Sequence, residues 1–207
     1  MRRLLSLGVL TVSALALRRY LAMRAALAAL PREFRHPLLP FLTVTVGPRT
    51  LPLHRLCMRF PTRPGSGVTA SQQLLPGDPA VRVLILSPTS SEPTPTARAA
   101  VLHLHGGGMV AGSPQFEALG GGRLVRELGA VVVSPDYRLA PEHPFPAALD
   151  DCMATLRWMR EHSRQLGIDP ERIGVAGASA GGGLSAAVAQ RAHDEGITLR
   201  AQVLVYP

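Results

Sequence analysis

Lysine is absent from this sequence of 207 residues, cysteine occurs only twice, and no uncharged apolar run reaches membrane-spanning length. Cys57 and Cys152 are too far apart in sequence to suggest a disulfide framework or a metal-ligand pair, so the redox compartment stays open. Both are predicted to be buried small residues. With 46% hydrophobic residues the chain can bury a core of ordinary size. It is therefore not a disordered protein, and its length suits one domain with a small appendage.

The formal net charge of +8 comes from the first 70 residues. Residues 1–70 carry eleven arginines and one acidic residue, giving +10, whereas residues 71–207 carry eleven arginines and thirteen acidic residues, giving −2. Recognition of nucleic acid would call for basic charge on the folded body, so we expect no nucleic-acid partner. The basic charge of the N-terminal extension is better explained by attraction to a membrane surface or by contacts that the extension makes as a cap on the folded body.

Residues 1–30 have the features of a signal-like or membrane-facing segment. Met1–Arg3 precedes the apolar run Leu4–Leu17, and Ala14–Ala16 is a candidate cleavage triplet. The run is shorter than the roughly 18 residues of a spanning helix, which disfavours a transmembrane anchor. Helical character continues over Tyr20–Leu30, where arginines interrupt an apolar surface. This pattern predicts either a helix on an anionic bilayer or a helix packed over an active site, and location stays open among cytoplasmic, membrane-associated and secreted.

Prolines divide the chain into two parts. Seven of them lie between positions 31 and 64, and Pro64–Gly67 has the composition of a linker. We therefore expect an N-terminal helical extension over residues 1–69 and the main domain over residues 70–207. Gln72–Leu75 and Val81–Ser87, which flank a turn rich in proline and glycine, are predicted to form an antiparallel pair of strands.

Downstream of this pair, short apolar runs alternate with longer helical stretches. The predicted strands are Ala99–Leu104, Ala130–Ser134, Arg172–Ala176 and Ala201–Tyr206, and the predicted helices are Phe116–Leu128, Ala147–Gln165 and Gly181–Glu195. Such alternation predicts an α/β fold: a mostly parallel sheet with helices on both faces and the antiparallel pair at one edge. Ligands bind such sheets at the carboxyl ends of the strands.

A serine between glycines stands at one of these strand ends. Ile173–Gly183 reads as a strand, a sharp turn and a helix, and the turn would hold the Ser179 hydroxyl out from the backbone in a strained conformation. Gly177 and Gly181 then occupy positions that must be nearly without side chains. A glycine-rich loop that packs a helix against a sheet would contain the same pentapeptide, so the motif alone is only suggestive.

Three glycines follow another strand end. Gly106, Gly107 and Gly108 come directly after His105, and consecutive glycines let backbone N–H groups point into a cavity, as a developing oxyanion requires. Two other interpretations of this histidine and glycine stretch are less well supported than an oxyanion-binding loop. A zinc site at His103 and His105 lacks a third ligand nearby, and a dinucleotide-binding loop should be followed by an opening helix rather than by Gly-Ser-Pro. We expect no metal and no cofactor.

A third stretch, Ser134–Asp151, contains Asp-Tyr-Arg-Leu-Ala-Pro-Glu, and Asp136, Arg138 and Glu142 within it are expected to pin their own loop. With the glycine loop and the serine turn, this stretch resembles the hormone-sensitive-lipase-like esterases of the α/β-hydrolase fold, over roughly residues 70–207. The resemblance implies that the extension is a cap, and that short- or medium-chain acyl esters are hydrolysed without a cofactor. It also implies the site residues: nucleophile Ser179, oxyanion hole Gly107, Gly108 and Ala180, and supporting loop His105 and Gly106.

Two positions depart from that family pattern. Residue 178 is alanine where the family usually carries aspartate, and Met109 stands where an aromatic residue is more usual. Neither change removes a catalytic group, although each could alter loop rigidity or the acyl pocket.

The family also keeps an acid and a histidine on loops after the serine, whereas this sequence ends at Pro207. We therefore expect a C-terminally truncated fragment that lacks the last strands, leaves an apolar edge strand unprotected and is close to inactive alone. His193 lies about 21 Å from Ser179 along the predicted helix, which is too far for it to act as the general base for the serine hydroxyl. His143 is the remaining candidate. The alternative is a non-catalytic protein that binds a small ligand in the glycine-lined cleft, and oligomeric state stays open.

Overall fold

The computed structural model describes residues 14, 17–18, 20–24, 27–35, 46–89 and 97–207. The chain forms two compact units, Met1–Thr50 and Leu51–Pro207. The second unit begins earlier than the boundary expected near residue 70. In the first unit residues 20–24 and 27–29 are helical, followed by the 3-10 turn η1 (Arg32–Phe34), while most of the signal-like run lies outside the described residues. Among the helices that are described, none is long and apolar enough to cross a membrane.

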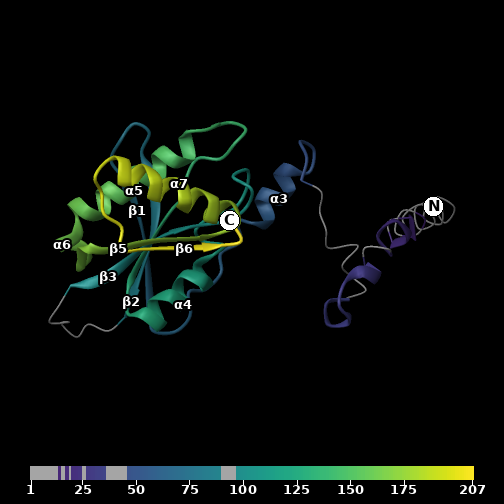
Figure 1. Cartoon of the computed structure of the whole chain (residues 1–207), viewed down its shortest axis with the longest axis horizontal. Coiled ribbons are helices and arrows are strands. Elements are labelled where there is room, and N and C mark those ends of the chain that lie inside the picture. The colour runs from purple at the N-terminus through teal and green to yellow at the C-terminus, as the bar shows by residue number, and fades with distance from the viewer. Residues whose placement is uncertain (1–13, 15–16, 19, 25–26, 36–45, 90–96) are drawn as a thin grey trace, which may run out of the picture. The chain divides into compact units, whose positions relative to one another are not determined.

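Six strands of the second unit form one sheet in the order β1-β2-β4-β3-β5-β6 (Figure 1). The strands are β1 (Val68–Leu75), β2 (Val81–Pro88), β3 (Arg98–Leu104), β4 (Val131–Pro135), β5 (Ile168–Ala178) and β6 (Ala201–Val205). β2 runs antiparallel to both of its neighbours, β1 and β4, and the pairs β4–β3, β3–β5 and β5–β6 are parallel. The predicted mostly parallel sheet with an antiparallel pair at one edge is confirmed.

Helices cover both faces of this sheet. The helices of this unit are α3 (Leu51–Cys57), α4 (Ala118–Leu128), α5 (Ala147–Glu161), α6 (Ser163–Leu166) and α7 (Ala180–Asp194). α5 and α7 lie on one face and α4 on the other (Figure 1). Because successive strand residues point to opposite faces, Val131 and Val133 of β4 join the core beneath α5 and α7, whereas Val132 packs with Val125 of α4.

Several local details differ from the sequence-based expectations. The helix predicted over Ala147–Gln165 ends at Glu161 and resumes as α6, and β5 begins at Ile168 instead of Arg172 because Ile168 already pairs with Arg98 of β3. Cys152 is buried as predicted. The prediction was wrong for Cys57, which is exposed on α3, a helix with no buried residue.

β6 forms the edge of the described sheet, where it pairs with β5. All five of its residues are exposed, and Val203 and Val205 retain 53% and 41% of their accessible surface. The neighbouring Tyr206 is 75% exposed. An apolar strand therefore forms this edge, as the sequence predicts.

Candidate active site

Ser179 connects β5 to α7 in a backbone conformation that residues with a side chain seldom adopt. Its φ is 54° and its ψ is −125°. A positive φ of this kind costs about 1–3 kcal/mol in a residue other than glycine, so neighbouring bonds must hold it. Ser179 donates its backbone N–H to the carbonyl oxygen of Val205 at 2.9 Å, and its own carbonyl accepts the N–H of Gly183 at 3.0 Å. The strained residue is thus fixed from β6 on one side and from α7 on the other.

The glycines on either side of Ser179 have no room for a methyl group. A Cβ at Gly177 would lie 2.8 Å from the carbonyl oxygen of Leu104 and closer still to that of Gly181. A Cβ at Gly181 would lie 2.7 Å from the carbonyl oxygen of His105 and closer still to that of Leu104. These obstacles are backbone atoms of Leu104 and His105, at and just after the end of β3, and of Gly181 in α7, and backbone atoms cannot rotate away. The prediction that both positions must be without side chains is confirmed.

The glycine loop adjoins this turn. A Cβ at Gly106 would lie 3.8 Å from the Cβ of Ser179. Gly107 and Gly108 both have positive φ angles, 121° and 65°, and Met109 follows them at 59°. Within the described part of the chain, no hydrogen bond takes up the N–H groups of Gly107 and Gly108. The structure therefore brings the serine and two free backbone donors to the same end of the sheet.

The N–H of Gly106, in contrast, is already engaged. It donates to the carboxylate of Glu117 at 2.7 Å. The carbonyl of Gly107 accepts from the N–H groups of Val110 at 3.2 Å and Ala111 at 3.0 Å, which closes the loop on itself. The N–H of Gly106 is therefore not available as an additional donor to a ligand.

His105 packs beneath the glycine loop as a neutral ring. It is 1% exposed, and this burial lowers its pKa to about 4. Because the ring is neutral at neutral pH, Nδ1 carries the proton when it donates to the carbonyl of Gly106 at 2.8 Å. Tyr137 stacks on the ring with centroids 4.1 Å apart, and its hydroxyl donates to the carbonyl of His105 at 2.7 Å. These contacts give the His105 side chain a supporting position under the loop.

Glu117 is the site residue that sequence reasoning missed. It precedes α4 and follows Gly106 by eleven residues, and at that position it reads only as an acidic residue near a helix start. Burial raises the pKa of its carboxyl, and the hydrogen bond from Gly106 opposes that rise. His103 Nε2 lies 3.9 Å from the same carboxylate, but burial lowers the pKa of His103 to about 4. At neutral pH the two therefore form no ion pair.

Two charged residues of the Asp-Tyr-Arg-Leu-Ala-Pro-Glu stretch hold its loop. Arg138 donates its side-chain N–H groups to the buried carboxylate of Asp151 at 2.9–3.1 Å, and its backbone N–H to the same group at 2.8 Å. Glu142 accepts two hydrogen bonds from Arg55 of α3. The Asp136 carboxyl makes no hydrogen bond among the described residues, and burial raises its pKa. The expectation that charged residues pin this loop therefore holds for Arg138 and for Glu142, whose partner lies on α3, and it was wrong for Asp136.

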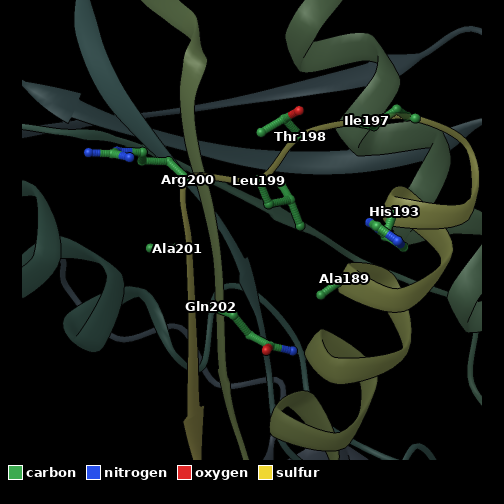
Figure 2. Close-up of a pocket in the computed structure, with 9 residues that line it drawn as sticks. Ala189, His193, Ile197, Thr198, Leu199, Arg200, Ala201 and Gln202 are labelled. Carbon is green, nitrogen blue, oxygen red and sulfur yellow. The ribbon is translucent and has the colours of Figure 1, made fainter.

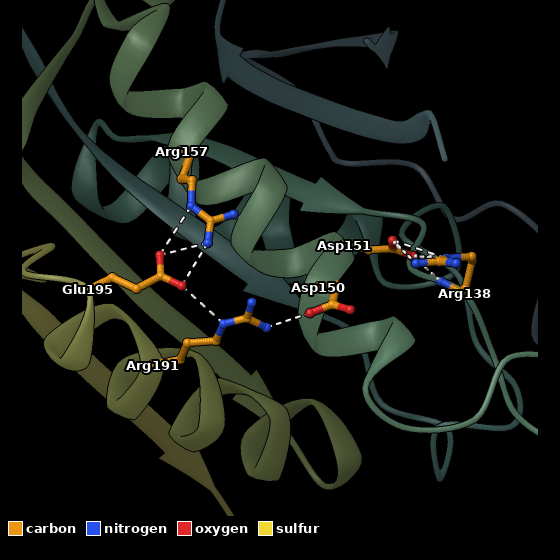
Figure 3. Close-up of polar contacts among 6 residues, drawn as sticks. All are labelled: Arg138, Asp150, Asp151, Arg157, Arg191 and Glu195. Atoms are coloured by element: carbon orange, nitrogen blue, oxygen red, sulfur yellow. Dashed lines mark hydrogen bonds and ion pairs between the residues drawn. The ribbon is translucent and has the colours of Figure 1, made fainter. Parts of the chain in front are cut away.

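A second set of charges ties α5 to α7 on the outer surface (Figure 3). Glu195 accepts from Arg157 at 2.6–3.1 Å and from Arg191 at 3.1 Å, and Arg191 also donates to Asp150 at 2.5 Å. Asp150 and Asp151 are adjacent, yet the first faces this network and the second faces Arg138 (Figure 3).

These adjacent aspartates give a matched pair of variants. Asp151→Ala should lower the free energy of unfolding by about 3 kcal/mol, because it leaves a guanidinium and a backbone N–H without their buried acceptor. Asp150→Ala removes only a pair whose side chains are 44% and 36% exposed, so it should cost about 0.5 kcal/mol. Urea denaturation measures both. Equal losses would show that the Arg138–Asp151 contact is no stronger than the surface pair.

An apolar pocket of about 190 Å³ lies between the glycine loop and α7. Met109 contributes from the loop, Leu184 and Ala187 from the helix, and His143 and Phe145 from the segment before α5. Its lining thus joins residues that follow Gly108 to residues on the helix that begins after Ser179. This pocket is suited to the apolar part of a ligand.

A larger hollow of about 560 Å³ lies elsewhere (Figure 2). It is formed by Ala189 and His193 in the C-terminal half of α7 and by the connection from Ile197 to Gln202. Because Ser179 precedes the first residue of α7, this hollow lies at the other end of the helix. It places His193 away from the serine, as predicted.

No metal centre is formed by the residues that the structure describes, since no three potential ligands among them gather. No histidine in this part of the chain makes a hydrogen bond with the Ser179 hydroxyl. His143 lies in the apolar pocket, where its backbone N–H donates to the carbonyl of Leu139 at 3.0 Å.

The fold and these motifs place the chain in a known family. Residues 101–207 match the family model described as alpha/beta hydrolase fold, and the chain belongs to that family. The chain is 51% identical over 110 residues to the esterase LipI of Mycobacterium tuberculosis, covering 52% of this chain and 34% of the relative. It is 36% identical over 174 residues to human hormone-sensitive lipase, covering 81% of this chain and 16% of the relative.

Solved structures of esterases show the same arrangement. The esterase LipW from Mycobacterium marinum superposes with a TM-score of 0.68 at 31% identity, covering 79% of this chain and 55% of that one. An arylesterase structure gives 0.63 at 32% identity, covering 72% and 48%. The resemblance to hormone-sensitive-lipase-like α/β hydrolases is confirmed. The chain spans about a third of the length of the first curated relative and about half of these solved chains.

Proposed function

We propose that this chain carries the nucleophile and the oxyanion hole of a carboxylic ester hydrolase. The observation that supports this most is the position of Ser179, strained and held by backbone bonds, next to Gly106 of the loop in which Gly107 and Gly108 have free N–H groups. Relatives named esterase, carboxylesterase and arylesterase support the same reaction.

In the proposed reaction the Ser179 hydroxyl oxygen attacks the ester carbonyl carbon and the hydroxyl proton passes to a base. The carbonyl electron pair moves onto oxygen, and the oxyanion accepts from the N–H groups of Gly107, Gly108 and Ala180. The alcohol leaves with a proton as the tetrahedral intermediate collapses to an acyl-enzyme. Water then adds to the acyl carbon, and the acid departs as the Ser179 oxygen regains its proton.

The backbone bonds determine which donors are available. The N–H of Gly106 is committed to Glu117 and that of Ser179 to Val205, so neither can serve the oxyanion. Ala180 is the first residue of α7, where the N–H groups have no partner within the helix and the helix dipole favours negative charge. The proposed oxyanion hole therefore consists of the N–H groups of Gly107, Gly108 and Ala180.

We assign no general base among the described histidines. His103 and His105 are buried and neutral, and His193 lies at the other end of α7. Without a base, serine is a poor nucleophile and oxyanion stabilisation alone gives only a small residual rate. The 207 residues by themselves should therefore be close to inactive. Ester hydrolysis is proposed for the full-length protein and not for these residues alone. The small apolar pocket suits a short- or medium-chain acyl group.

The test is hydrolysis of aryl esters of increasing acyl length by the purified full-length protein. We expect steady-state release of the phenol, fastest with short or medium chains. If the protein bound these esters saturably and released no phenol, the alternative of a non-catalytic protein that binds small ligands would replace the enzyme.

A further inference from the structure

One arginine links α3 to the glycine loop and to the Asp-Tyr-Arg-Leu-Ala-Pro-Glu loop. Arg55 donates from Nε to the carbonyl of Val110 at 2.7 Å and from Nη2 to the carbonyl of Ala140 at 2.7 Å. Its Nη1 and Nη2 also donate to the carboxylate of Glu142 at 2.8 and 2.7 Å. A single planar guanidinium thus joins the glycine loop to the Asp-Tyr-Arg-Leu-Ala-Pro-Glu loop.

The helix that carries this arginine has little apolar anchoring of its own. α3 has no buried residue, and Leu53 and Leu56 are 62% and 59% exposed. The Arg55 side chain, in contrast, is 23% exposed. Polar contacts of Arg55, rather than packing of the leucines, therefore fix α3 against the two loops.

The carbonyl that Arg55 holds belongs to Val110, which directly follows three residues of the glycine loop with positive φ. Gly107, Gly108 and Met109 all have positive φ, and at Met109, which is not a glycine, this conformation persists only when surrounding contacts enforce it. The carbonyl of Met109 accepts the N–H of Ala140 at 2.9 Å, and that of Val110 accepts Arg55. Both donors, the Ala140 N–H and the Arg55 guanidinium, lie outside the glycine loop. Because Arg55 also binds the Ala140 carbonyl, both bonds are linked to the position of the Ala140 segment.

We propose that Arg55 is a positioning residue that sets the direction of the Gly107 and Gly108 N–H groups. It does so by holding the Val110 carbonyl and the Ala140–Glu142 segment in one plane. The catalytic consequence rests on the proposed ester hydrolase, whereas the positioning itself does not. Lysine cannot replace it, because one ammonium group cannot reproduce the fixed fork of donors. The Arg55 guanidinium lowers the pKa of the Glu142 carboxyl to about 2, so the pair stays charged at neutral pH.

Amide hydrogen exchange followed by mass spectrometry tests the positioning without any assay of activity. In Arg55→Ala, exchange of residues 105–112 should accelerate by about tenfold or more, the equivalent of losing a hydrogen bond to a charged group. Exchange of β3 and β4 should not change. Arg123→Ala is the matched control, since it removes an arginine–glutamate bond of 2.7 Å on α4 that touches neither loop. Unchanged exchange over residues 105–112 in Arg55→Ala would overturn the proposal.

Kinetics of the full-length protein test the catalytic consequence. Arg55→Ala should lower kcat by about tenfold to a hundredfold with little change in KM, because displaced donors weaken the transition state more than substrate binding. Arg55→Lys should recover little of this loss. Glu142→Gln keeps both carbonyl contacts of Arg55 and should lose much less. Equal losses in Glu142→Gln and Arg55→Ala would assign the effect to the ion pair and overturn the proposal. Absence of hydrolysis in the wild type would refute the proposed function, and the exchange result would then decide the role of Arg55.

Discussion

Replacing Ser179 with alanine should reduce kcat for ester hydrolysis by the full-length protein by about 10⁴-fold to 10⁶-fold. The variant would keep the proposed oxyanion donors and lose the proposed nucleophile. It should also fold normally, because the Ser179 hydroxyl makes no hydrogen bond among the described residues and alanine adopts the same φ at the same cost. Steady-state kinetics and thermal unfolding measured together separate loss of the nucleophile from loss of the fold.

Ser185→Ala is the matched control for this loss. Ser185 is a buried serine of α7 whose hydroxyl donates to the carbonyl of Gly181 at 2.7 Å, and it has no place in the proposed reaction. This variant should keep most of its activity. Comparable activity in Ser179→Ala and Ser185→Ala would remove Ser179 from the mechanism.

Gly181→Ala should lower the free energy of unfolding by about 3 kcal/mol or more. The added methyl group would overlap the carbonyl oxygens of Leu104, the buried last residue of β3, and of His105, the buried residue that follows it. Relief would require α7 to move away from the sheet, and this would displace Ser179 from the glycine loop. Urea denaturation measures the loss in stability.

Gly183→Ala tests the same substitution two residues later. Gly183 lies in the same helix, and a Cβ there would meet no atom within 4 Å. Because alanine loses less conformational entropy than glycine in a helix, this variant should gain about 0.5–1 kcal/mol. If both variants changed stability by similar amounts, close contact between the first turn of α7 and the end of β3 would not be the reason for glycine at position 181.

The local parts of the site could be predicted from sequence because their requirements are local. Ser179 and its flanking glycines predict a strand, a tight turn and a helix within eleven residues. The three consecutive glycines of the glycine loop likewise predict free backbone N–H groups. Alternating apolar runs likewise predict the parallel sheet. The assignments of Ser179, Gly107, Gly108 and Ala180 to catalysis remain predictions.

The supporting contacts could not be predicted, because they join distant parts of the chain. Arg55 lies in the proline-rich stretch that leads into the predicted linker. Glu142 follows it by 87 residues, and nothing nearby in sequence indicates that the two are partners. Glu117 reads as one more acidic residue at a helix start, although its carboxylate holds Gly106. Contacts between residues distant in sequence also explain why the second unit begins at Leu51 and not near residue 70. Bonds such as that from Arg55 to Val110 join residues 51–69 to the rest of this unit.

The most direct measurement is mass-spectrometric mapping of the covalent intermediate. The full-length protein would be quenched in acid during turnover of an aryl ester, or treated with an aryl fluorophosphonate, and then digested. We predict one modified peptide, with the acyl or phosphonyl group on Ser179, and no modification in Ser179→Ala. Ester turnover with Ser179 unmodified, or a modification carried by another residue, would contradict the assignment of Ser179 as nucleophile.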